Sequence, residues 1–474
     1  MAERIIHLLQ ITLVACLVIA LIIQIDVGWA DNGDFTRIMT WFTSGPVGLE
    51  PNIPPSDSPA WKSRFFAHYL PYWKLDFPLT SEAYSSVLLL WLPGVLLNYL
   101  VYSTRVLALP LASIVPRILF VAILLISLFW LADRSLKRSE ALILSLVVGV
   151  PLVLLLSTAD YVAYLNTFYQ EIASFIFLFL LLFSLIRLKR RRSLFNYLLS
   201  FTSLVLLATA KPSNLYWPFL ALLWIIPFSP RKTKPVVLPF IYILLAIAIA
   251  IPAAWLGRRG ISPQINEYHS LFLGILPLSQ YPQRHLDVLG MPAAFRCIGK
   301  NAHTVGANCY VKYRDRLSFL VDIHLLLSEP LIFPRILKTA AAEIQDISLG
   351  FSKYAEGGPD RISIHLPMEL NFWSRMKASY FPRGYPLLFL LVSWIGLFAW
   401  NISQPGFRGE AAALGLLASC ACLVDMLVAY IGDGRSELTK HLFLSNLLFD
   451  IALLAFFAWL VILVLEYRTR QKLS

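Results

Sequence analysis

Long apolar runs separated by short polar segments fill most of the chain, and this pattern predicts a bundle of membrane-spanning helices. A helix rises 1.5 Å per residue, so a run of about 18 to 20 apolar residues crosses a hydrocarbon core of roughly 30 Å. Ten runs, some of them shorter than this, are expected to cross: 5–25, 114–131, 141–156, 167–186, 194–210, 215–228, 236–256, 385–400, 411–431 and 442–465. The predicted fold class is therefore an all-α polytopic membrane protein with about ten transmembrane helices.

One further apolar run, at 87–102, is expected to behave differently. It carries Pro93 and Gly94 in its middle, a pair that breaks or kinks a helix. It also follows a segment rich in Pro and Trp. We therefore expect a helix that lies in the outer membrane interface without spanning it. If this run did cross, the first loop would face the opposite side.

Basic residues give the expected orientation. The densest cluster of Lys and Arg lies at 187–192, and short loops rich in these residues stay in the cytoplasm. Counting crossings from this cluster places both termini inside, and the first loop and the turn at 432–440 outside. The expected location is the bacterial inner membrane, with the active site facing the periplasm or cell exterior.

Composition agrees with a membrane protein. The chain is 58% hydrophobic and 14% charged, whereas soluble chains carry about 25% charged residues. The net charge of +12 falls in short clusters and forms no regular basic helix face. We therefore expect membrane lipids as partners, anionic lipids among them, and no nucleic acid.

The chain is expected to divide into three parts. Residues 1–256 form an N-terminal transmembrane module with a catalytic first external loop at 26–110, and residues 383–474 form a C-terminal three-helix module. Between them, residues 257–382 have mixed charges and no long apolar run, which predicts an inserted external domain. Cys297 and Cys309 lie in this domain and either form a disulfide or remain two free thiols.

Two acids follow the first membrane helix almost directly. Asp31 and Asp34 flank an Asn-Gly pair, which favours a tight turn and so aims both carboxylates at one small volume. The alternative is that Asp31 only closes an Asx-turn or caps a helix that begins near Phe35. We assign Asp34 as the general base, with Arg37 and Phe35 holding its ionised form near the cavity, and Asp31 a supporting role.

Other polar groups are expected on the same outer side. Lys211, beside Pro212 at a helix end, is either an anion contact or a lysine that reaches to the membrane interface. Glu171 is also explained by its place at a helix N-terminus. The candidates for binding the sugar or acceptor are Asp160, Tyr164, Asn166, Tyr169, Glu171 and Asp433, and those for binding the donor phosphate are Lys211, Arg435, Lys440 and His441.

Three polar residues lie inside predicted membrane helices. Asp425 precedes the last outer turn, and Asn446 and Asp450 follow it, four apart on one helix face. Acids within a membrane are costly and point to function. We expect these residues to line a polar cavity.

Residues 1–230 resemble, in architecture, the GT-C class of membrane glycosyltransferases, which includes protein mannosyltransferases and the aminoarabinose transferase of lipid A. The shared features are the first-loop acids, the interfacial helix, the polar-aromatic turn at 160–171 and the Lys211-Pro212 turn. The resemblance implies that Asp34 or Asp31 is the base or binds the acceptor, and that transfer inverts the anomeric centre. This chain has D-x-x-D where the class more often has adjacent acids or D-x-D. It also lacks the Trp-Trp-Asp-Tyr-Gly signature, which argues against transfer onto asparagine. The last outer turn is similar to that of hexosyltransferases of bacterial surface-glycan clusters.

The chemistry expected from the residues alone is the same. The cytoplasmic loops are too short to form a nucleotide-binding domain, so the donor should be a polyprenyl-phosphate sugar reached from the membrane. The acceptor is a glycan, lipid or protein of the cell envelope. No cofactor and no metal site are expected, although carboxylates of this kind can hold a divalent cation. The alternative is a transporter or flippase of lipid-linked glycans, or a glycan polymerase.

Overall fold

The computed structural model describes residues 2–49, 58–65, 69–80, 84–131, 138–225, 244–252, 262–303, 306–346 and 371–471. Most of these residues are helical, and the all-α polytopic membrane class is confirmed. Five helical spans are long and apolar enough to cross a membrane: Ile5–Ile23, Leu109–Leu128, Glu171–Arg190, Gly406–Asp433 and Phe443–Arg468. Two bent pairs, Ala141–Ser157 with Ala159–Asn166 and Phe372–Tyr380 with Tyr385–Asn401, bring the number to seven if each pair is one span.

The remaining expected crossings are short or lie largely outside the described residues. Helix α11 has 15 residues and α12 has 9 described residues, both below the length of a straight span. Most of the run expected at 236–256 lies outside the described residues, apart from a helical piece at 244–252. The described residues therefore contain fewer spans than the ten expected. Several apolar runs form helices that are shorter than the bilayer is thick.

The first half of the chain contains these helices and strands: α1 Ala2–Ile23, α2 Thr36–Met39, β1 Thr43–Pro46, α3 Pro59–Arg64, β2 Tyr72–Leu75, α4 Val87–Val101, β3 Val106–Ala108, α5 Leu109–Ala112, α6 Ile114–Leu131, α7 Arg138–Leu144, η1 Ser145–Gly149, α8 Val150–Ser157, α9 Ala159–Val162, η2 Ala163–Asn166, α10 Glu171–Arg190, α11 Leu194–Ala208, η3 Pro212–Tyr216 and α12 Trp217–Ile225. The second half contains α14 Ser262–His269, η4 Ser270–Ile275, α15 Leu276–Leu278, α16 Pro282–Val288, η5 Pro292–Cys297, α17 Ala307–Tyr313, η6 Arg314–Arg316, α18 Phe319–Ser328, α19 Ile332–Glu343, α20 Phe372–Tyr380, α21 Tyr385–Asn401, α22 Gly406–Asp433, α23 Leu438–His441 and α24 Phe443–Gln471.

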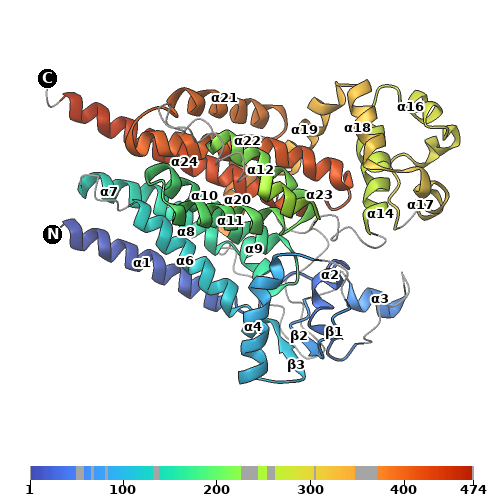
Figure 1. The fold of residues 1–474 in the computed structure, drawn as a ribbon, viewed down its shortest axis with the longest axis horizontal. Helices are drawn as coiled ribbons and strands as arrows, with labels where there is room; N and C mark the ends of the chain where they lie inside the picture. The colour runs from blue at the N-terminus through green and yellow to red at the C-terminus, as the bar shows by residue number, and fades with distance from the viewer. Residues whose placement is uncertain are drawn as a thin grey trace.

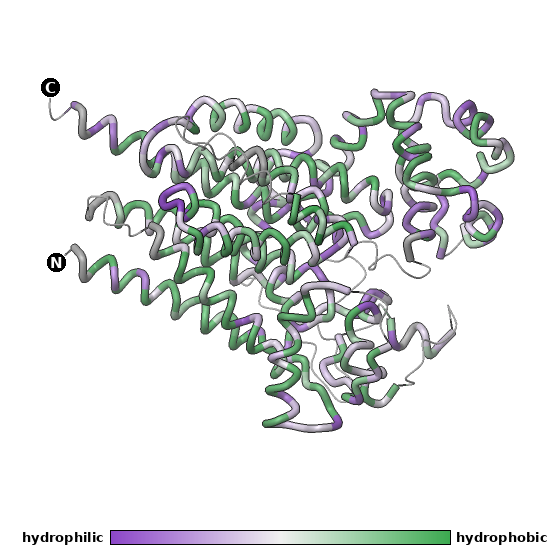
Figure 2. Tube along the Cα trace, in the orientation of Figure 1, coloured by the Kyte–Doolittle hydropathy of each residue, from purple (hydrophilic) through white to green (hydrophobic). Residues whose placement is uncertain are grey.

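The two chain termini lie at one end of the helical bundle, and the first loop and the inserted segment lie at the other end (Figure 1). The first loop contributes α2, α3 and the strands, and the inserted segment contributes α14 to α18. The bundle between the two ends is coloured mostly as hydrophobic residues in Figure 2. This arrangement agrees with the expectation that both termini lie on the same side of the membrane, and which side that is remains a prediction.

Helix α4 runs crosswise to α1 and α6 in Figure 1, which agrees with an interfacial helix rather than a span. Its 15 residues continue through Pro93 without a break. Gly94 explains how the helix packs, because a Cβ atom there would lie 1.9 Å from the carbonyl oxygen of Ala112. Only glycine allows this close approach to α5.

The first loop contains a small sheet that the hydrophobic pattern did not predict. Strands β1, β2 and β3 pair in that order, both pairs antiparallel. Each strand has three or four residues, too few for a recognisable alternating pattern. Trp73 of β2 is fully buried, and its ring lies 5.9 Å from Phe35 and 5.5 Å from Phe168. This aromatic contact fastens the acidic turn to the bundle.

The inserted segment carries a disulfide. Cys297 and Cys309 are bonded, with their Cα atoms 5.8 Å apart. Of the two alternatives, a disulfide or two free thiols, the structure contains the disulfide. The disulfide joins η5 to α17 and fits the expected placement outside the cytoplasm, where thiols oxidise.

The orientation can be tested by cysteine labelling. In a background with Cys16, Cys420 and Cys422 replaced by alanine, we expect Val47→Cys to react with an impermeant thiol reagent in intact cells, because Val47 is exposed in the first loop. Arg192→Cys should react only after permeabilisation, because it lies in the basic cluster expected inside. The reverse labelling pattern would show that the protein has the opposite orientation in the membrane.

Candidate functional site

Two turns from opposite ends of the chain meet and form a polar cavity of about 180 Å³. The first is the acidic turn that follows α1, and the second is the turn that joins α22 to α24. The inserted segment covers them with side chains of α14. The residues that line the cavity are Asn32, Gly33, Asp34, Arg37, Ile265, Asn266, His269, His303, Asp433, Ser436, Glu437, Lys440 and His441.

Asp31 shapes the first turn. Its Oδ1 accepts hydrogen bonds from the backbone N–H groups of Gly33, at 2.7 Å, and Phe35, at 3.2 Å. Gly33 has φ +100°, a conformation that favours glycine. Asp31 is 2% exposed and is absent from the cavity lining. The Asx-turn expected as the alternative is therefore what the structure contains.

Asp34 points into the cavity and is held by two cations. Lys440 Nζ donates to its Oδ2 at 2.5 Å, and Arg37 lies 3.0 Å from Oδ1. Burial alone would raise the pKa of Asp34, but the charges of Arg37 and Lys440 bring this pKa below its usual range. Asp34 is therefore ionised, as expected, and Arg37 holds its ionised form.

Lys440 is the centre of the cavity's ion pairs. Its side chain is 2% exposed, and Nζ also donates to Glu437 Oε2 at 2.7 Å. Burial would lower the pKa of Lys440, but Asp34 and Glu437 raise it above its usual value. Asn32 completes the group by donating from Nδ2 to Glu437. The turn after α1 and the turn between α22 and α24 are thus joined by two side-chain contacts.

A chain of hydrogen bonds runs from the N-terminal end of α10 into the cavity. Lys211 Nζ donates to Glu171 Oε1 at 2.7 Å and lies 3.4 Å from His441 Nδ1. His441 Nε2 lies 3.1 Å from Asp433 Oδ2, and His269 Nδ1 lies 2.8 Å from Asp433 Oδ1. Because the lysine can only donate, a neutral His441 with its proton on Nε2 satisfies both contacts.

His269 is oriented by the backbone. The N–H of Ala302 donates to His269 Nε2 at 3.0 Å, so the proton of the neutral ring must be on Nδ1 and is donated to Asp433. Asp433 therefore accepts from two imidazoles and places them on either side of itself. A histidine from the inserted segment thus becomes part of the same site.

The predicted donor-phosphate residues divide between the cavity and the surface. Lys440 and His441 line the cavity, and Lys211 adjoins it through its contact with His441. Arg435 does not join them: its side chain is 58% exposed and lies 3.3 Å from Glu343 of α19. Its assignment to the donor site is corrected, because the left-handed backbone at Gly434 turns the chain before Arg435.

The predicted sugar-binding residues are also divided. Asp433 lines the cavity, and Glu171 is linked to it through Lys211 and His441; the other four do not line the cavity. Asn166 is fully buried; it donates to the carbonyls of Ile25 and Val27, both at 2.7 Å, and accepts from Arg117 at 3.0 Å. These bonds fix the chain as it leaves α1, so Asn166 is a structural residue.

The two tyrosines lie behind the cavity. The Tyr169 hydroxyl donates to the Ala30 carbonyl at 2.8 Å, and Lys440 Nζ lies 5.5 Å from its ring centroid. Tyr164 is fully buried, with its ring 4.6 Å from that of Phe443. Asp160 is likewise fully buried in α9. These three side chains are buried and do not line the cavity.

The intramembrane acids do not line the cavity, contrary to expectation. Asp450 Oδ2 accepts from Lys377 at 2.7 Å and from Tyr161 at 3.0 Å, and Lys377 also contacts Asn446. Asp425 accepts from Tyr216 at 2.9 Å and from Ser445 at 2.6 Å. A lysine and hydroxyl groups from other segments thus compensate these polar groups, which join helices instead of facing a ligand.

Sequence reasoning missed several polar residues of the cavity, among them Glu437, Asn32, His269 and His303. Glu437 had a local signal, because it precedes Lys440 by three residues, a spacing at which helical side chains meet. It also has φ +47°, a strained conformation for a residue with a side chain. Asn32 was read only as a turn residue, and nothing local to His269 and His303 pointed to a site so distant in the chain.

Asp31 gives the site a pH-dependent stability. Burial raises its pKa to about 7 from the ordinary 3.8, and Arg64 only partly opposes this. Because the folded protein keeps the proton and the unfolded chain loses it, unfolding becomes easier as pH rises from about 4 to about 7, by on the order of 4 kcal/mol in all.

We expect Asp31→Asn to remove this pH dependence, because an amide oxygen can accept the same two backbone N–H bonds without ionising. The melting temperature of the variant in detergent should exceed that of the wild type more at pH 8 than at pH 5. An equal difference at both pH values would mean that Asp31 is charged in the folded protein at pH 5.

Within the described ranges, no group of three or more His, Cys, Asp or Glu side chains is arranged to hold a metal ion. Of the cavity's carboxylates, Asp34 and Glu437 contact Lys440 or Arg37, and Asp433 contacts His269 and His441.

Comparison with known proteins gives a family. The model of the YfdI N-terminal transmembrane domain matches residues 1–473. No curated protein and no solved structure matches the chain.

Proposed function

This chain belongs to the YfdI N-terminal transmembrane domain family, and on that premise we propose that it is a membrane glycosyltransferase of the GT-C type. It transfers a sugar from a polyprenyl-phosphate donor to a glycan, lipid or protein acceptor of the cell envelope. The reaction takes place in the polar cavity, on the outer face of the bacterial inner membrane.

One observation carries the proposal. An ionised aspartate of the first loop, Asp34, lies in a cavity with Arg37, Lys440 and His441 at the end of an apolar bundle. A carboxylate can accept the proton of an acceptor hydroxyl, and nearby cations can stabilise the negative charge of a departing phosphate. A polyprenyl chain can remain in the bilayer while its phosphate enters at this end.

The bonds change in a single displacement. The acceptor oxygen forms a bond to the anomeric carbon as the bond between that carbon and the phosphate oxygen breaks. The acceptor proton passes to Asp34, and polyprenyl phosphate leaves with the bonding electrons. One displacement inverts the anomeric centre.

The ion pairs suggest how the donor activates the base. A carboxylate held by Lys440 and Arg37 is a weak base, because its pKa lies below the usual range. A donor phosphate competes with Asp34 for Lys440 and so loosens the 2.5 Å contact. The pKa of Asp34 then rises toward the pH at which it accepts a proton, at the time when the donor is in place.

Lys211 and His441 provide a second contact for the phosphate. Both side chains are 15% exposed and mostly desolvated; His441 lines the cavity, and Lys211 contacts it from behind. Glu171 holds Lys211 and Asp433 holds His441 before the donor arrives. These carboxylates fix both side chains in position. The Lys211 ammonium has three N–H groups, so it has one more to donate to a phosphate oxygen beside its contacts with Glu171 and His441.

Transfer is favoured over transport by where the polar groups lie. Among the described residues, the cavity with a mainly polar lining lies at the loop end of the bundle, with side chains of both outer turns. A flippase needs a polar path through the membrane. In the described part of the bundle, the buried charges Lys377 and Asp450 pair with each other and join α20 to α24, so they are not available to a passing headgroup.

The test is transfer in membranes that contain the full chain. Polyprenyl-phosphate donors that carry different labelled sugars are incubated with envelope acceptors, and labelled product is separated from donor. We expect transfer from at least one donor, and inverted linkage in the product. Movement of the labelled donor across proteoliposome membranes without any transfer would instead establish the flippase.

A further inference from the structure

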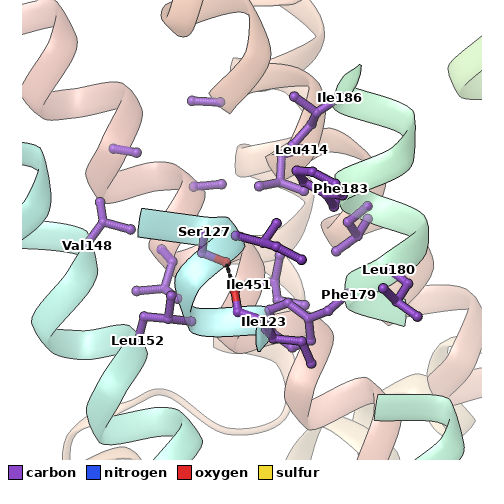
Figure 3. Close-up of a pocket in the computed structure, with 16 residues that line it drawn as sticks. Ile123, Ser127, Val148, Leu152, Phe179, Leu180, Phe183, Ile186, Leu414 and Ile451 are labelled. Carbon is purple, nitrogen blue, oxygen red and sulfur yellow. Dashed lines mark hydrogen bonds between the residues drawn. The ribbon is translucent and has the colours of Figure 1, made fainter. Parts of the chain in front are cut away.

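A second pocket lies within the bundle, and none of its residues line the polar cavity. It is formed between α6, η1, α8, α10, α22 and α24 (Figure 3). The residues that line it are Ile123, Ile126, Ser127, Val148, Leu152, Phe179, Leu180, Leu182, Phe183, Ile186, Ala411, Leu414, Ile451, Leu454, Ala455 and Ala458.

This pocket has no polar group to offer a ligand. Fifteen of its sixteen lining residues carry hydrocarbon side chains. The exception, Ser127, donates its hydroxyl proton to the Ile123 carbonyl at 2.8 Å, as the dashed line in Figure 3 shows. An empty apolar cavity loses dispersion contacts and does not hold water. Phe179 and Leu180 are only half-buried, so the pocket reaches the surface of the bundle.

One end of the pocket adjoins the basic cluster. Ile186 lines the pocket and is followed by Arg187, whose guanidinium carbon lies 5.6 Å from the ring centroid of Phe183, another lining residue. Phe183, Ile186 and Leu414 lie close together in Figure 3. The apolar pocket and the positive charges therefore meet at the end of α10.

The cluster is placed by an ion pair between helices. Arg190 makes two 2.7 Å bonds with Glu410, which lies one turn before Leu414 of α22. This pair holds the end of α10 against α22. Arg187, Arg191 and Arg192 are exposed beside it.

We propose that the pocket and the basic cluster together bind one anionic phospholipid. An acyl chain occupies the pocket, and the phosphate of the headgroup contacts Arg187, Arg191 and Arg192. Basic pockets between membrane helices are suited to anionic headgroups. The lipid belongs to the leaflet at the end of the bundle where the termini lie, opposite the polar cavity, so it is distinct from the sugar donor.

Native mass spectrometry of the full chain in detergent tests this site. The probes are phosphatidylglycerol, phosphatidylcholine and glycerol 3-phosphate. We expect phosphatidylglycerol to bind about tenfold or more tightly than phosphatidylcholine, because each basic residue near an anionic headgroup contributes about a fivefold change. Glycerol 3-phosphate, which has no acyl chain, should not bind.

Two sets of variants distinguish binding of the lipid's acyl chain from binding of its headgroup. Ala455→Phe fills the pocket and should remove phosphatidylglycerol binding, while Leu198→Phe on the exposed face of α11 should not. Changing Arg187, Arg191 and Arg192 to Gln should lower the affinity about tenfold to a hundredfold. Changing the exposed Arg284, Arg296 and Arg314 to Gln is the matched control. The arginine variants keep the pocket intact, so they test the site even if Ala455→Phe fails to fold.

Two results would overturn the proposal. Equal binding of phosphatidylglycerol and phosphatidylcholine, unchanged by the arginine variants, would mean that the pocket only takes up bulk lipid. Displacement of phosphatidylglycerol by polyprenyl phosphate would mean that the pocket belongs to the donor site.

Discussion

We expect Asp34→Asn to lower glycosyl transfer by about 10²- to 10⁴-fold, the usual effect of losing a general base. Asparagine keeps the size of the side chain and can still accept a hydrogen bond from Lys440, but it cannot take a proton from the acceptor. The measurement is the rate of transfer of labelled sugar from polyprenyl phosphate in membranes with matched amounts of protein.

Asp31→Asn is the matched control for Asp34→Asn. It changes the same chemical group three residues earlier, at a position that the cavity does not include. Its effect on transfer should be much smaller, because the amide retains the two backbone hydrogen bonds. If Asp31→Asn abolished transfer and Asp34→Asn did not, the two roles would be exchanged. If both variants remained fully active, the acidic turn would have no part in the reaction.

Lys440→Met should be the second most damaging change. Methionine has a similar shape without the charge, so Asp34 and Glu437 lose their shared partner. Removing one electrostatic contact to a developing anion lowers the rate by about 10²- to 10³-fold. The fold is also destabilised, because Glu437 loses its cation and Asp34 keeps only Arg37. Transfer rate and melting temperature should both fall, whereas Lys312→Met, at an exposed lysine, should change neither.

The pH profile separates the two effects of Lys440→Met. With Lys440 gone, only Arg37 lowers the pKa of Asp34 among its close contacts, so that pKa rises. The acidic limb of the pH–rate profile should therefore move to higher pH, since Asp34 must lose its proton before it can act as a base. A lower rate with an unmoved acidic limb would mean that Asp34 is not the base.

Local patterns predicted much of the site's first turn. Asp31, Gly33 and Phe35 lie within five residues, so the Asx-turn follows from side-chain and backbone geometry that short-range sequence already contains. The same holds for the Arg37–Asp34 ion pair, at a spacing of three. Lys211, Lys440 and His441 could be chosen because charged residues at helix ends near a membrane are few.

The residue type gave a wrong prediction of function where the side chain's partner lies far away along the chain. Asn166 resembled a sugar ligand by type, but its amide is used by the carbonyls after α1, which lie 139 to 142 residues earlier in the chain. Asp450 resembled a cavity residue, but Lys377 compensates it within the bundle. In each case the side chain's function depended on a partner that no local pattern can name.

The sequence by itself determined that this chain forms apolar helices in a membrane and carries an acidic turn after the first of them. Those features depend on local hydrophobicity, measured against a bilayer of nearly fixed thickness, and on the short-range geometry of an Asn-Gly turn. Only the tertiary structure decided that Asp34 meets Lys440, 406 residues away, and that His269 of the inserted segment joins Asp433. These contacts form because helix packing brings distant ends together, and the cost of leaving a buried charge unpaired selects the partner.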